Sequence, residues 1–307
     1  MKKVKSLDRS VVLIPIFILF LFSCSEVKKR DRRNMTVVFY NVENLFDLVD
    51  EPVKKDEEFT PEGEKKWTKE RYSKKLKDLA EVFTSINENE LPEIIGLSEV
   101  ENKKVLEDLI STGKLAEGSY KIIHYDSPDF RGIDNALVYR KDEFKVLDHL
   151  AVGVTFKDKP DYKTRDILYV KGQTKNRERL HIFVNHWPSR IGGRERTEPS
   201  RIAVASVLKQ KTDSIFNADK NAKIIIMGDM NDEPVNRSLL ETLGAKSPED
   251  KTAELVNLMF PGDAEGKGSY SYRGNWNMLD QLIVSRNLLD EKGFQVSGKK
   301  GFVFHED

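Results

Sequence analysis

The segment spanning residues 223–233, KIIIMGDMNDE, constrains the fold of this chain more than any other segment. Its run of three isoleucines predicts a short buried strand. Gly228 allows a tight turn at the end of the strand, so Asp229 and Asn231 are expected at the rim of a sheet. A carboxylate there can bind a hard cation or orient a water molecule, and an amide can donate a hydrogen bond to a phosphate oxygen. Because a strand ending in Gly-Asp is more often followed by an ordinary turn, this interpretation needs support from other strand ends.

Similar polar groups lie at the ends of several other predicted strands. They are Asn41 and Glu43 after residues 36–41, Glu99 at the end of 91–99, Asn185 and His186 at the end of 179–186, and Asp280 near the start of 279–284. Acids and amides together at so many strand ends are hard to explain by turn chemistry alone. The set suits attack of water on a phosphate ester. A hard divalent ion takes carboxylate oxygens and neutralises the phosphate, while His and Asn donate hydrogen bonds to the charged transition state.

The remaining segments predict one α/β domain that begins at about Thr36. Apolar residues at helical spacing predict a helix over residues 67–86, and further helices are expected over 103–110 and 200–216. Additional strands are expected over residues 120–125, 135–140 and 144–150. No internal repeat and no linker rich in Pro, Gly or Ser divides the chain, which favours a single domain with helices mixed among strands.

The charge balance excludes a global positive field that would attract nucleic acid. Beyond residue 23 the sequence holds 47 basic and 50 acidic residues, so nucleic-acid binding would need a local patch. Arg190, Arg194, Arg196 and Arg201 lie within twelve residues. A run like this is usually a solvated loop, but its position just after His186 makes a phosphate contact by Arg190 a hypothesis to test.

The first 23 residues are predicted to be a signal peptide. Four basic residues, Lys2, Lys3, Lys5 and Arg9, precede an apolar run, residues 11–22, that is too short to span a bilayer comfortably. Cys24 is the only cysteine, which excludes an internal disulfide, and it follows Leu-Phe-Ser in a sequence that resembles the lipobox of bacterial lipoproteins. We therefore expect Cys24 to be lipidated and residues 24–35 to form a charged tether. The protein would then be a lipoprotein of the cell envelope, facing the periplasm or the exterior.

Five segments resemble, in order, the motifs of the endonuclease/exonuclease/phosphatase superfamily. They are FYNVENLFD, IIGLSEVEN, FVNHWPSR, IIIMGDMNDEP and LDQLIVS, and they span roughly residues 36–285. The resemblance implies an α/β fold, a four-layer α-β-β-α sandwich of two mixed sheets flanked by helices. It also implies metal-dependent hydrolysis of phosphate esters, without specifying a substrate.

The resemblance assigns roles to residues within these motifs. Glu99 resembles the principal ligand of a divalent metal, Mg²⁺ or Mn²⁺, and Glu43 falls where some members place an acid near that metal. Asp229 resembles the aspartate that orients or deprotonates the attacking water. His186 and Asn231 resemble groups that contact the phosphate. Plain structural roles stay open. Asn41 and Asn231 could be turn residues, His186 a satisfied strand-end histidine and Glu43 a structural or solvent-facing acid.

Substrate binding is assigned to Asn41 and Asn185 by the resemblance and to Arg190 by its position. Asp280 resembles the acid that pairs with a histidine in a C-terminal Ser-Asp-His motif. No Asp-His pair follows Asp280, and the FHED sequence around His305 does not match that motif. We therefore expect residues 36–307 to form a domain that is shortened at its C-terminus, lacks its last strands and has weak activity or none.

The leading functional hypothesis is a monomeric, lipid-anchored phosphoesterase that depends on a divalent metal and cleaves phosphodiesters such as those of DNA or RNA. A second hypothesis is a lipid-anchored binding protein that keeps the same fold without turnover. A third is a phosphomonoesterase that acts on sugar or inositol phosphates. Hydrolysis of mono- and diester substrates with and without a chelator separates the three.

Overall fold

The computed structural model describes residues 34–87, 90–290 and 293–305. The predicted signal peptide, Cys24 and residues 24–33 of the predicted tether lie outside these ranges. Met35–Asp307 forms one structural unit. Within the described ranges, no helix combines the length and the apolar character needed to cross a membrane.

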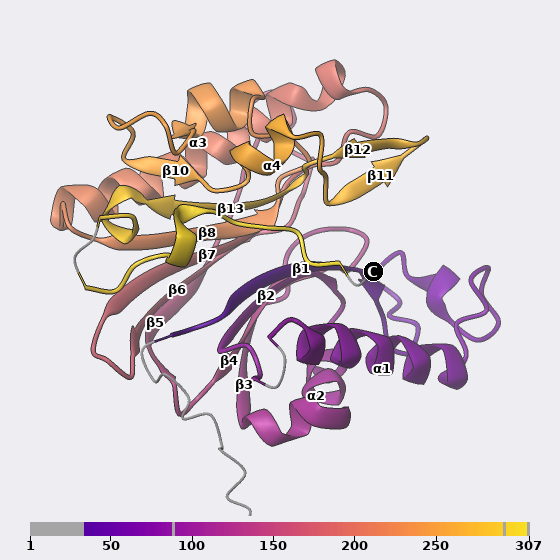
Figure 1. Cartoon of the computed structure of the whole chain (residues 1–307). Helices are drawn as coiled ribbons and strands as arrows, with labels where there is room; N and C mark the ends of the chain where they lie inside the picture. The colour runs from indigo at the N-terminus through magenta and orange to yellow at the C-terminus, as the bar shows by residue number, and fades with distance from the viewer. Residues whose placement is uncertain (1–33, 88–89, 291–292, 306–307) are drawn as a thin grey trace, which may run out of the picture. The chain divides into compact units, whose positions relative to one another are not determined.

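Most strands of the unit belong to two mixed sheets (Figure 1). The four-stranded sheet has the order β1 (Val37–Leu45), β2 (Ile94–Val100), β4 (Asp134–Arg140), β3 (Tyr120–His124). The seven-stranded sheet has the order β5 (Phe144–Val152), β6 (Ile167–Thr174), β7 (Arg179–His186), β8 (Lys223–Asp229), β13 (Asp280–Ser285), β10 (Leu255–Asn257), β9 (Ala245–Lys246). A separate hairpin consists of β11 (Tyr270–Tyr272) and β12 (Asn275–Asn277). The pairs β1–β2 and β7–β8 are parallel, whereas β2–β4 and β8–β13 are antiparallel.

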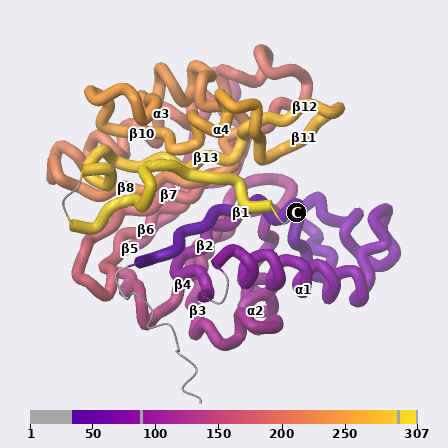
Figure 2. Tube along the Cα trace, viewed as in Figure 1, coloured from indigo at the N-terminus to yellow at the C-terminus, as the bar shows by residue number. Residues whose placement is uncertain are grey.

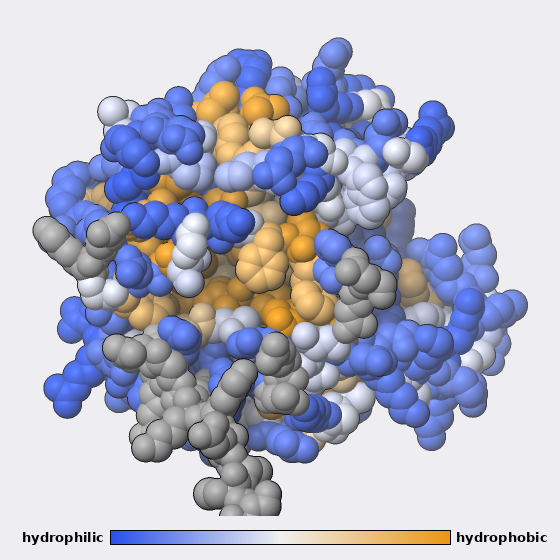
Figure 3. All heavy atoms as spheres, viewed as in Figure 1, coloured by the Kyte–Doolittle hydropathy of each residue, from blue (hydrophilic) through white to orange (hydrophobic). Residues whose placement is uncertain are grey.

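The central core of the unit lies between the two sheets. Ile94 and Leu137 of the four-stranded sheet share one apolar cluster with Val184 and Met227 of the seven-stranded sheet. Gly96 allows the sheets to approach closely, because a Cβ atom at this position would lie 2.3 Å from the Sδ atom of Met227. Figure 3 shows apolar side chains in the seam between the sheets on the face of Figure 1.

Helices cover the two outer faces of the sheets (Figure 1). α1 (Lys69–Ser85) and α2 (Lys103–Ile110) pack on the four-stranded sheet, and α3 (Arg194–Ala218) and the π-helical segment η3 (Ser238–Leu243) pack on the seven-stranded sheet. A short helix α4 (Phe260–Ala264) and 3₁₀ turns at Glu57–Phe59, Gly113–Gly118, Arg286–Leu288 and Ser297–Lys299 complete the described helices. The predicted four-layer α-β-β-α sandwich is therefore confirmed.

The helix predicted to begin at residue 200 begins six residues earlier, at Arg194. Pro199 lies inside the helix, although a proline is usually a helix boundary because it lacks the amide hydrogen. In the structure Arg201 reaches back along the helix and donates to the carbonyl of Arg194 at 2.9 Å and to Oγ1 of Thr197 at 2.7 Å. These contacts support the turns around the proline.

Several strands were not predicted at all. β6 was missed, and so were β9, β10 and the hairpin β11–β12, whose strands have only two or three residues each. Strands this short carry almost no periodic signal, because their pairing partners decide whether they form.

After β13 the chain turns back and passes the residues that directly follow β10, and its yellow trace then runs toward the end of β1 (Figure 2). The amide of Gly301 donates to the carbonyl of Leu258 at 3.1 Å, and a Cβ atom on Gly301 would lie 2.7 Å from the Sδ atom of Met259. His305 is exposed and belongs to no helix or strand. The expectation that the domain lacks its last strands stays a prediction.

Candidate active site

The ends of β1 and β2 bring Asn41 and Glu99 to one edge of the four-stranded sheet. Asn41 lies opposite Ser98 in the parallel register, and both strands become irregular directly after this pair. Glu43 and Glu99 have positive φ angles of 51° and 62°, a conformation that costs non-glycine residues on the order of 1–3 kcal/mol each. The amide Nδ2 of Asn41 donates to Oε1 of Glu99 at 3.4 Å, so the two side chains point to the same place.

The seven-stranded sheet supplies the other half of the site. Asp229 at the end of β8 pairs in register with His186 on β7 and with Asp280 on β13. Residues directly opposite each other on neighbouring strands point to the same face of a sheet, so these three side chains are neighbours. Gly228 permits this arrangement, because a Cβ atom there would lie 2.3 Å from the carbonyl oxygen of Asn185.

Contacts between the two sheets join these halves into one group. Nδ2 of Asn41 donates to Oδ2 of Asp229 at 3.0 Å. Nε2 of His186 lies 3.7 Å from Oε1 of Glu99 and 3.8 Å from Oδ2 of Asp229. The structure therefore brings together four of the predicted site residues, with Asp280 beside them.

The carboxylates of this group repel one another in a buried environment. Burial raises the pKa of Asp229 to about 6, and repulsion from Glu99 adds to the rise, while hydrogen bonds from the Asn231 amide and from Asn41 oppose it. Burial also raises the pKa of Asp280 to about 8, and Asp229 is the main charge that adds to it. Oδ1 of Asp280 is buried and accepts no hydrogen bond from the described residues. Clustered carboxylate oxygens of this kind fit a hard divalent cation, which would relieve the repulsion.

His186 is buried and neutral. Burial lowers its pKa well below the ordinary value of 6.5, and the positive charges of Arg165 and Arg131 lower it further. Nδ1 of His186 is buried and has no hydrogen-bond partner among the described residues. A neutral imidazole in this position can donate one hydrogen bond to a phosphate oxygen.

Two arginines beside the site were missed or underrated by the sequence reasoning. Nη2 of Arg131 lies 4.0 Å from Oε2 of Glu99 and donates to Oδ1 of Asn44 at 2.7 Å. Nη1 of Arg165 pairs with Oδ2 of Asp129 at 3.1 Å, and its Nη2 donates to a backbone carbonyl at 2.6 Å. Both arginines reach the site through tertiary placement, which no local sequence pattern indicates.

Asn231 and Asn185 are held by protein groups. Asn231 has a φ angle of 50°, its amide donates to Oδ1 of Asp229 at 2.9 Å, and its Nδ2 donates to the carbonyl of Trp187 at 3.0 Å. Asn185 is fully buried, donates to the carbonyl of Met227 at 3.3 Å and accepts from Nε1 of Trp187 at 3.2 Å. The structure thus brings Asn231 beside Asp229 but does not bring the amide of Asn185 into the group.

Arg190 holds the loop that follows β8. Its Nε donates to the carbonyl of Asn231 at 2.7 Å, and its Nη2 lies 3.4 Å from both Asp232 and Glu233. Asp232 also forms a buried ion pair with Arg201 at 2.8 Å. The sequence reasoning missed Asp232, although the second aspartate of the DMND run was an available signal.

Glu43 lies at the rim of the group and is exposed. Its amide donates to Oδ1 of Asn41 at 2.9 Å, and its carbonyl accepts from Nζ of Lys75 at 2.6 Å. Its carboxylate is close enough to add to the raised pKa of Asp280, after burial and the charges of Asp229 and Glu99. Its predicted role as a metal ligand stays a prediction.

Two other features of the described chain include none of the predicted site residues. His124, Asp126 and Asp134 place three potential ligand atoms within 4.8 Å of one another. Both oxygens of Asp134 already have partners, since Oδ2 lies 3.0 Å from Nε2 of His124 and Oδ1 accepts from the amide of Ser127 at 2.7 Å. This pairing fits a structural role.

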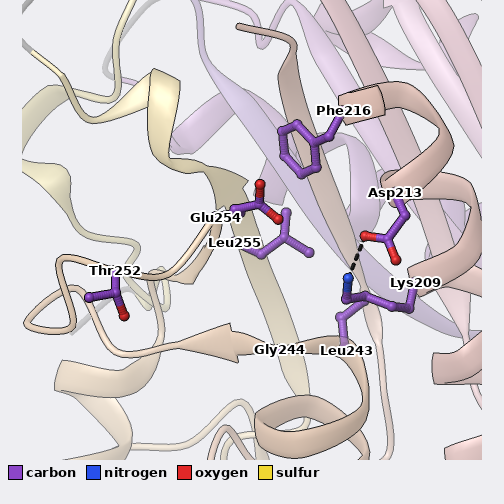
Figure 4. A pocket seen from close by; sticks show the side chains of 8 residues that line it. All are labelled: Lys209, Asp213, Phe216, Leu243, Gly244, Thr252, Glu254 and Leu255. Carbon is purple, nitrogen blue, oxygen red and sulfur yellow. Dashed lines mark hydrogen bonds and ion pairs between the residues drawn. The ribbon is translucent and has the colours of Figure 1, made fainter. Parts of the chain in front are cut away.

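A pocket of about 450 Å³ lies beside α3 (Figure 4). Its lining residues are Lys209, Asp213, Phe216, Leu243, Gly244, Thr252, Glu254 and Leu255. Lys209 and Asp213 pair with each other, and none of the predicted site residues lines the pocket.

Comparisons with known proteins agree with this geometry. The model of the Endonuclease/Exonuclease/phosphatase family matches residues 36–307. No curated protein matches the sequence. Among solved structures, humanized D. rerio TDP2 is 14% identical with a TM-score of 0.54, covering 81% of this chain and 83% of that one. An endonuclease/exonuclease/phosphatase family protein from Bacteroides thetaiotaomicron is 16% identical (TM-score 0.53, 81% and 83% covered).

A mannosyl-6-phosphatase from Bacteroides thetaiotaomicron is also 16% identical, with a TM-score of 0.52 and coverage of 82% of this chain and 85% of that one. At these identities the solved structures show a shared fold. The family match extends over almost the whole described unit and includes every motif residue of the site. The chain therefore belongs to the endonuclease/exonuclease/phosphatase family, whose members hydrolyse phosphate esters with the help of divalent metal ions.

Proposed function

We propose that the protein is a phosphodiesterase that depends on Mg²⁺ or Mn²⁺. The observation that carries this proposal is the meeting of Asn41 and Glu99 from one sheet with His186 and Asp229 from the other. A non-catalytic fold would have no need to bury carboxylates that repel one another at the meeting point of two sheets.

The residues of the group divide the chemistry among them. Glu99 would hold the metal ion, whose charge neutralises the phosphate when it is bound. Asp229 orients the attacking water and accepts its proton, while Asn41 fixes the Asp229 carboxylate through the 3.0 Å hydrogen bond. His186, neutral and buried, donates a hydrogen bond to a phosphate oxygen as negative charge develops there.

An aromatic hairpin beside the site supports a substrate that extends beyond the phosphate. Tyr270, Tyr272 and Trp276 on β11 and β12 are 47%, 53% and 60% exposed. The hairpin is tied to the site at its base, where Oγ of Ser269 accepts from the amide of Asp280 at 2.9 Å. Exposed aromatic rings stack on nucleic-acid bases, which favours a diester of that type.

A phosphomonoesterase acting on a sugar phosphate is the second candidate. The similarity in fold to a mannosyl-6-phosphatase and the absence of a net positive charge on the chain favour it. Both candidates use the same central residues, so they differ only in what the surrounding loops accept.

The test is hydrolysis of bis-p-nitrophenyl phosphate and p-nitrophenyl phosphate with Mg²⁺ or Mn²⁺, and again with chelator. We expect turnover of the diester that depends on metal, is lost in Glu99→Gln and is kept in Glu117→Gln, which makes the same change at an exposed site. Preference for the monoester would support the second candidate. Hydrolysis of neither ester under any metal condition would contradict both and support a non-catalytic binding protein.

We further propose that the protein is anchored to the cell envelope by a lipid on Cys24. The basic start, the short apolar run and the cysteine directly after it support this localisation. The anchor would place the phosphoesterase site outside the cytoplasmic membrane.

A further inference from the structure

The loop between β3 and β4, residues 125–133, brings a positive charge to one side of Glu99. Nη2 of Arg131 in this loop lies 4.0 Å from Oε2 of Glu99. The other carboxylate oxygen, Oε1, lies 3.4 Å from Nδ2 of Asn41 and 3.7 Å from Nε2 of His186. The carboxylate of Glu99 therefore lies between Arg131 on one side and the Asn41 and His186 side chains on the other.

The charge of the Arg131 guanidinium is not neutralised by a close acid. Its Nη2 donates to Oδ1 of Asn44 at 2.7 Å, and this amide oxygen carries no charge. No carboxylate of the described residues accepts a hydrogen bond from the guanidinium, because the separation of 4.0 Å from Glu99 exceeds the usual length of a charge-assisted hydrogen bond, about 2.7–2.9 Å. The side chain is 37% exposed, so its remaining N–H groups are accessible to a ligand.

The neighbouring arginines, in contrast, are occupied by acids. Nη1 of Arg165 donates to Oδ2 of Asp129 at 3.1 Å. Nη2 of Arg190 donates to Oδ1 of Asp232 at 3.4 Å. Arg131 differs from both, since it has no carboxylate at hydrogen-bond distance within the described parts of the chain.

Protein contacts hold Arg131 in this place. Asp129 is 2% exposed, and its Oδ1 accepts from the backbone amide of Arg131 at 2.9 Å while its Oδ2 is taken by Arg165. Asn44, which accepts from the guanidinium, has a φ angle of 63° that few non-glycine residues adopt. Backbone and side chain of Arg131 are thus fixed before a ligand binds, which lowers the entropy lost on binding.

We propose that Arg131 is a substrate-binding residue whose guanidinium donates hydrogen bonds to a non-bridging phosphate oxygen of the ester. The planar fork of N–H donors in arginine matches the oxygens of a phosphate group. A phosphate anion that approaches Glu99 and Asp229 is repelled by their carboxylates, and the positive charge of Arg131 offsets part of this repulsion. The inference rests on the proposed hydrolysis of phosphate esters, but monoesters and diesters both have non-bridging oxygens, so it holds for either candidate substrate class.

The test is the binding of inorganic phosphate to the full chain in the presence of Mg²⁺, measured by calorimetry. Arg131→Gln should weaken this binding about tenfold to a hundredfold, because hydrogen bonds between charged groups are lost. It should lower kcat/KM by a similar factor for whichever p-nitrophenyl ester the parent hydrolyses. Arg131→Lys keeps the charge without the fork and should recover part of the loss.

Arg179→Gln is the matched control, because it removes the same charge at an exposed position, at the opposite end of β7 from His186. It should bind phosphate as the parent does. Asn44→Gly provides a second variant in case Arg131→Gln does not fold. Glycine suits the φ angle of 63°, and the change removes the acceptor that orients Arg131, so phosphate binding should weaken here too.

Two results would overturn the inference. They are phosphate binding by Arg131→Gln within about twofold of the parent, and no phosphate binding by the parent. A parent that binds phosphate but hydrolyses neither ester would contradict the proposed function, and the comparison of phosphate binding would still decide the role of Arg131.

Discussion

Replacing Asp232 with asparagine should destabilise the protein strongly, although the change is nearly isosteric. The Asp232 side chain is 1% exposed and lies 2.8 Å from Nε of Arg201, whose side chain is completely buried. Asp232 also accepts from Oγ of Ser238 at 2.6 Å and lies 3.4 Å from Arg190. Asp232→Asn removes the negative charge that all of these groups face and leaves Arg201 as a buried cation without an anionic partner.

The expected loss in free energy of unfolding is about 3–5 kcal/mol, because removing one member of a buried ion pair leaves the other uncompensated. Since domains have total stabilities of roughly 5–15 kcal/mol, the variant should lose a large share of its stability. Urea denaturation, followed by tryptophan fluorescence, measures this free energy of unfolding. If its slope against urea concentration is unchanged, the substitution has not altered the surface exposed on unfolding. Glu241→Gln is the control, since it breaks an exposed pair with Arg237 that is worth at most about 1 kcal/mol.

A double variant separates the lost charge from other effects of the substitution. Adding Arg201→Met to Asp232→Asn removes both charges and should recover part of the stability, because a buried pair can often be replaced by apolar groups at little cost. A loss below about 1 kcal/mol in Asp232→Asn, similar to an exposed pair, would refute the reasoning that this pair holds the loop after β8.

Three further predictions follow from the site and the sequence. Asp229→Asn should lower kcat for bis-p-nitrophenyl phosphate on the order of 10²–10⁴-fold without unfolding the protein, and turnover within tenfold of the parent would count against a role in proton transfer. Burial lowers the pKa of His181 to about 4, below its unfolded value near 6.5, so the unfolded state takes up the proton first and stability falls as the pH drops from 6.5 to 4. His181→Asn should flatten this part of the pH–stability curve, as measured by urea denaturation. Cys24→Ser should move the protein from the membrane fraction to the soluble fraction, and retention in the membrane would rule out lipidation as its anchor.

Local patterns were enough to predict the elements that carry their own signal. The isoleucine run before Gly228 is β8, and the helical spacing of Leu76, Leu79 and Phe83 is the buried face of α1. The polar residues at the strand ends were predictable as well, because each one follows an apolar run that can be recognised from its own short segment. Packing between distant segments had no such signal, which is why the placement of Arg165 was not foreseen.

The assignment of both Asn185 and His186 to the site could have been corrected from the sequence alone. Successive side chains of a strand point to opposite faces, so two adjacent residues cannot both face the same site. In the structure His186 joins the active-site group, while the amide of Asn185 bonds to Met227 and Trp187 instead. The alternation of side chains along β7 therefore predicts that only one of these two residues faces the site.

The hydrogen bond between Asn41 and Asp229 joins the two sheets, so the geometry of the candidate active site depends on the distance between them. Neither sheet contains the whole group, so a shift of one sheet relative to the other by about one ångström would move the carboxylate of Asp229 away from Glu99, the proposed metal ligand. The spacing between the sheets depends on the core, where Gly96 lies against the side chain of Met227. The proposed phosphodiesterase activity would therefore depend on the packing of the apolar side chains between the sheets, and heat or denaturant that loosens this packing should lower the activity.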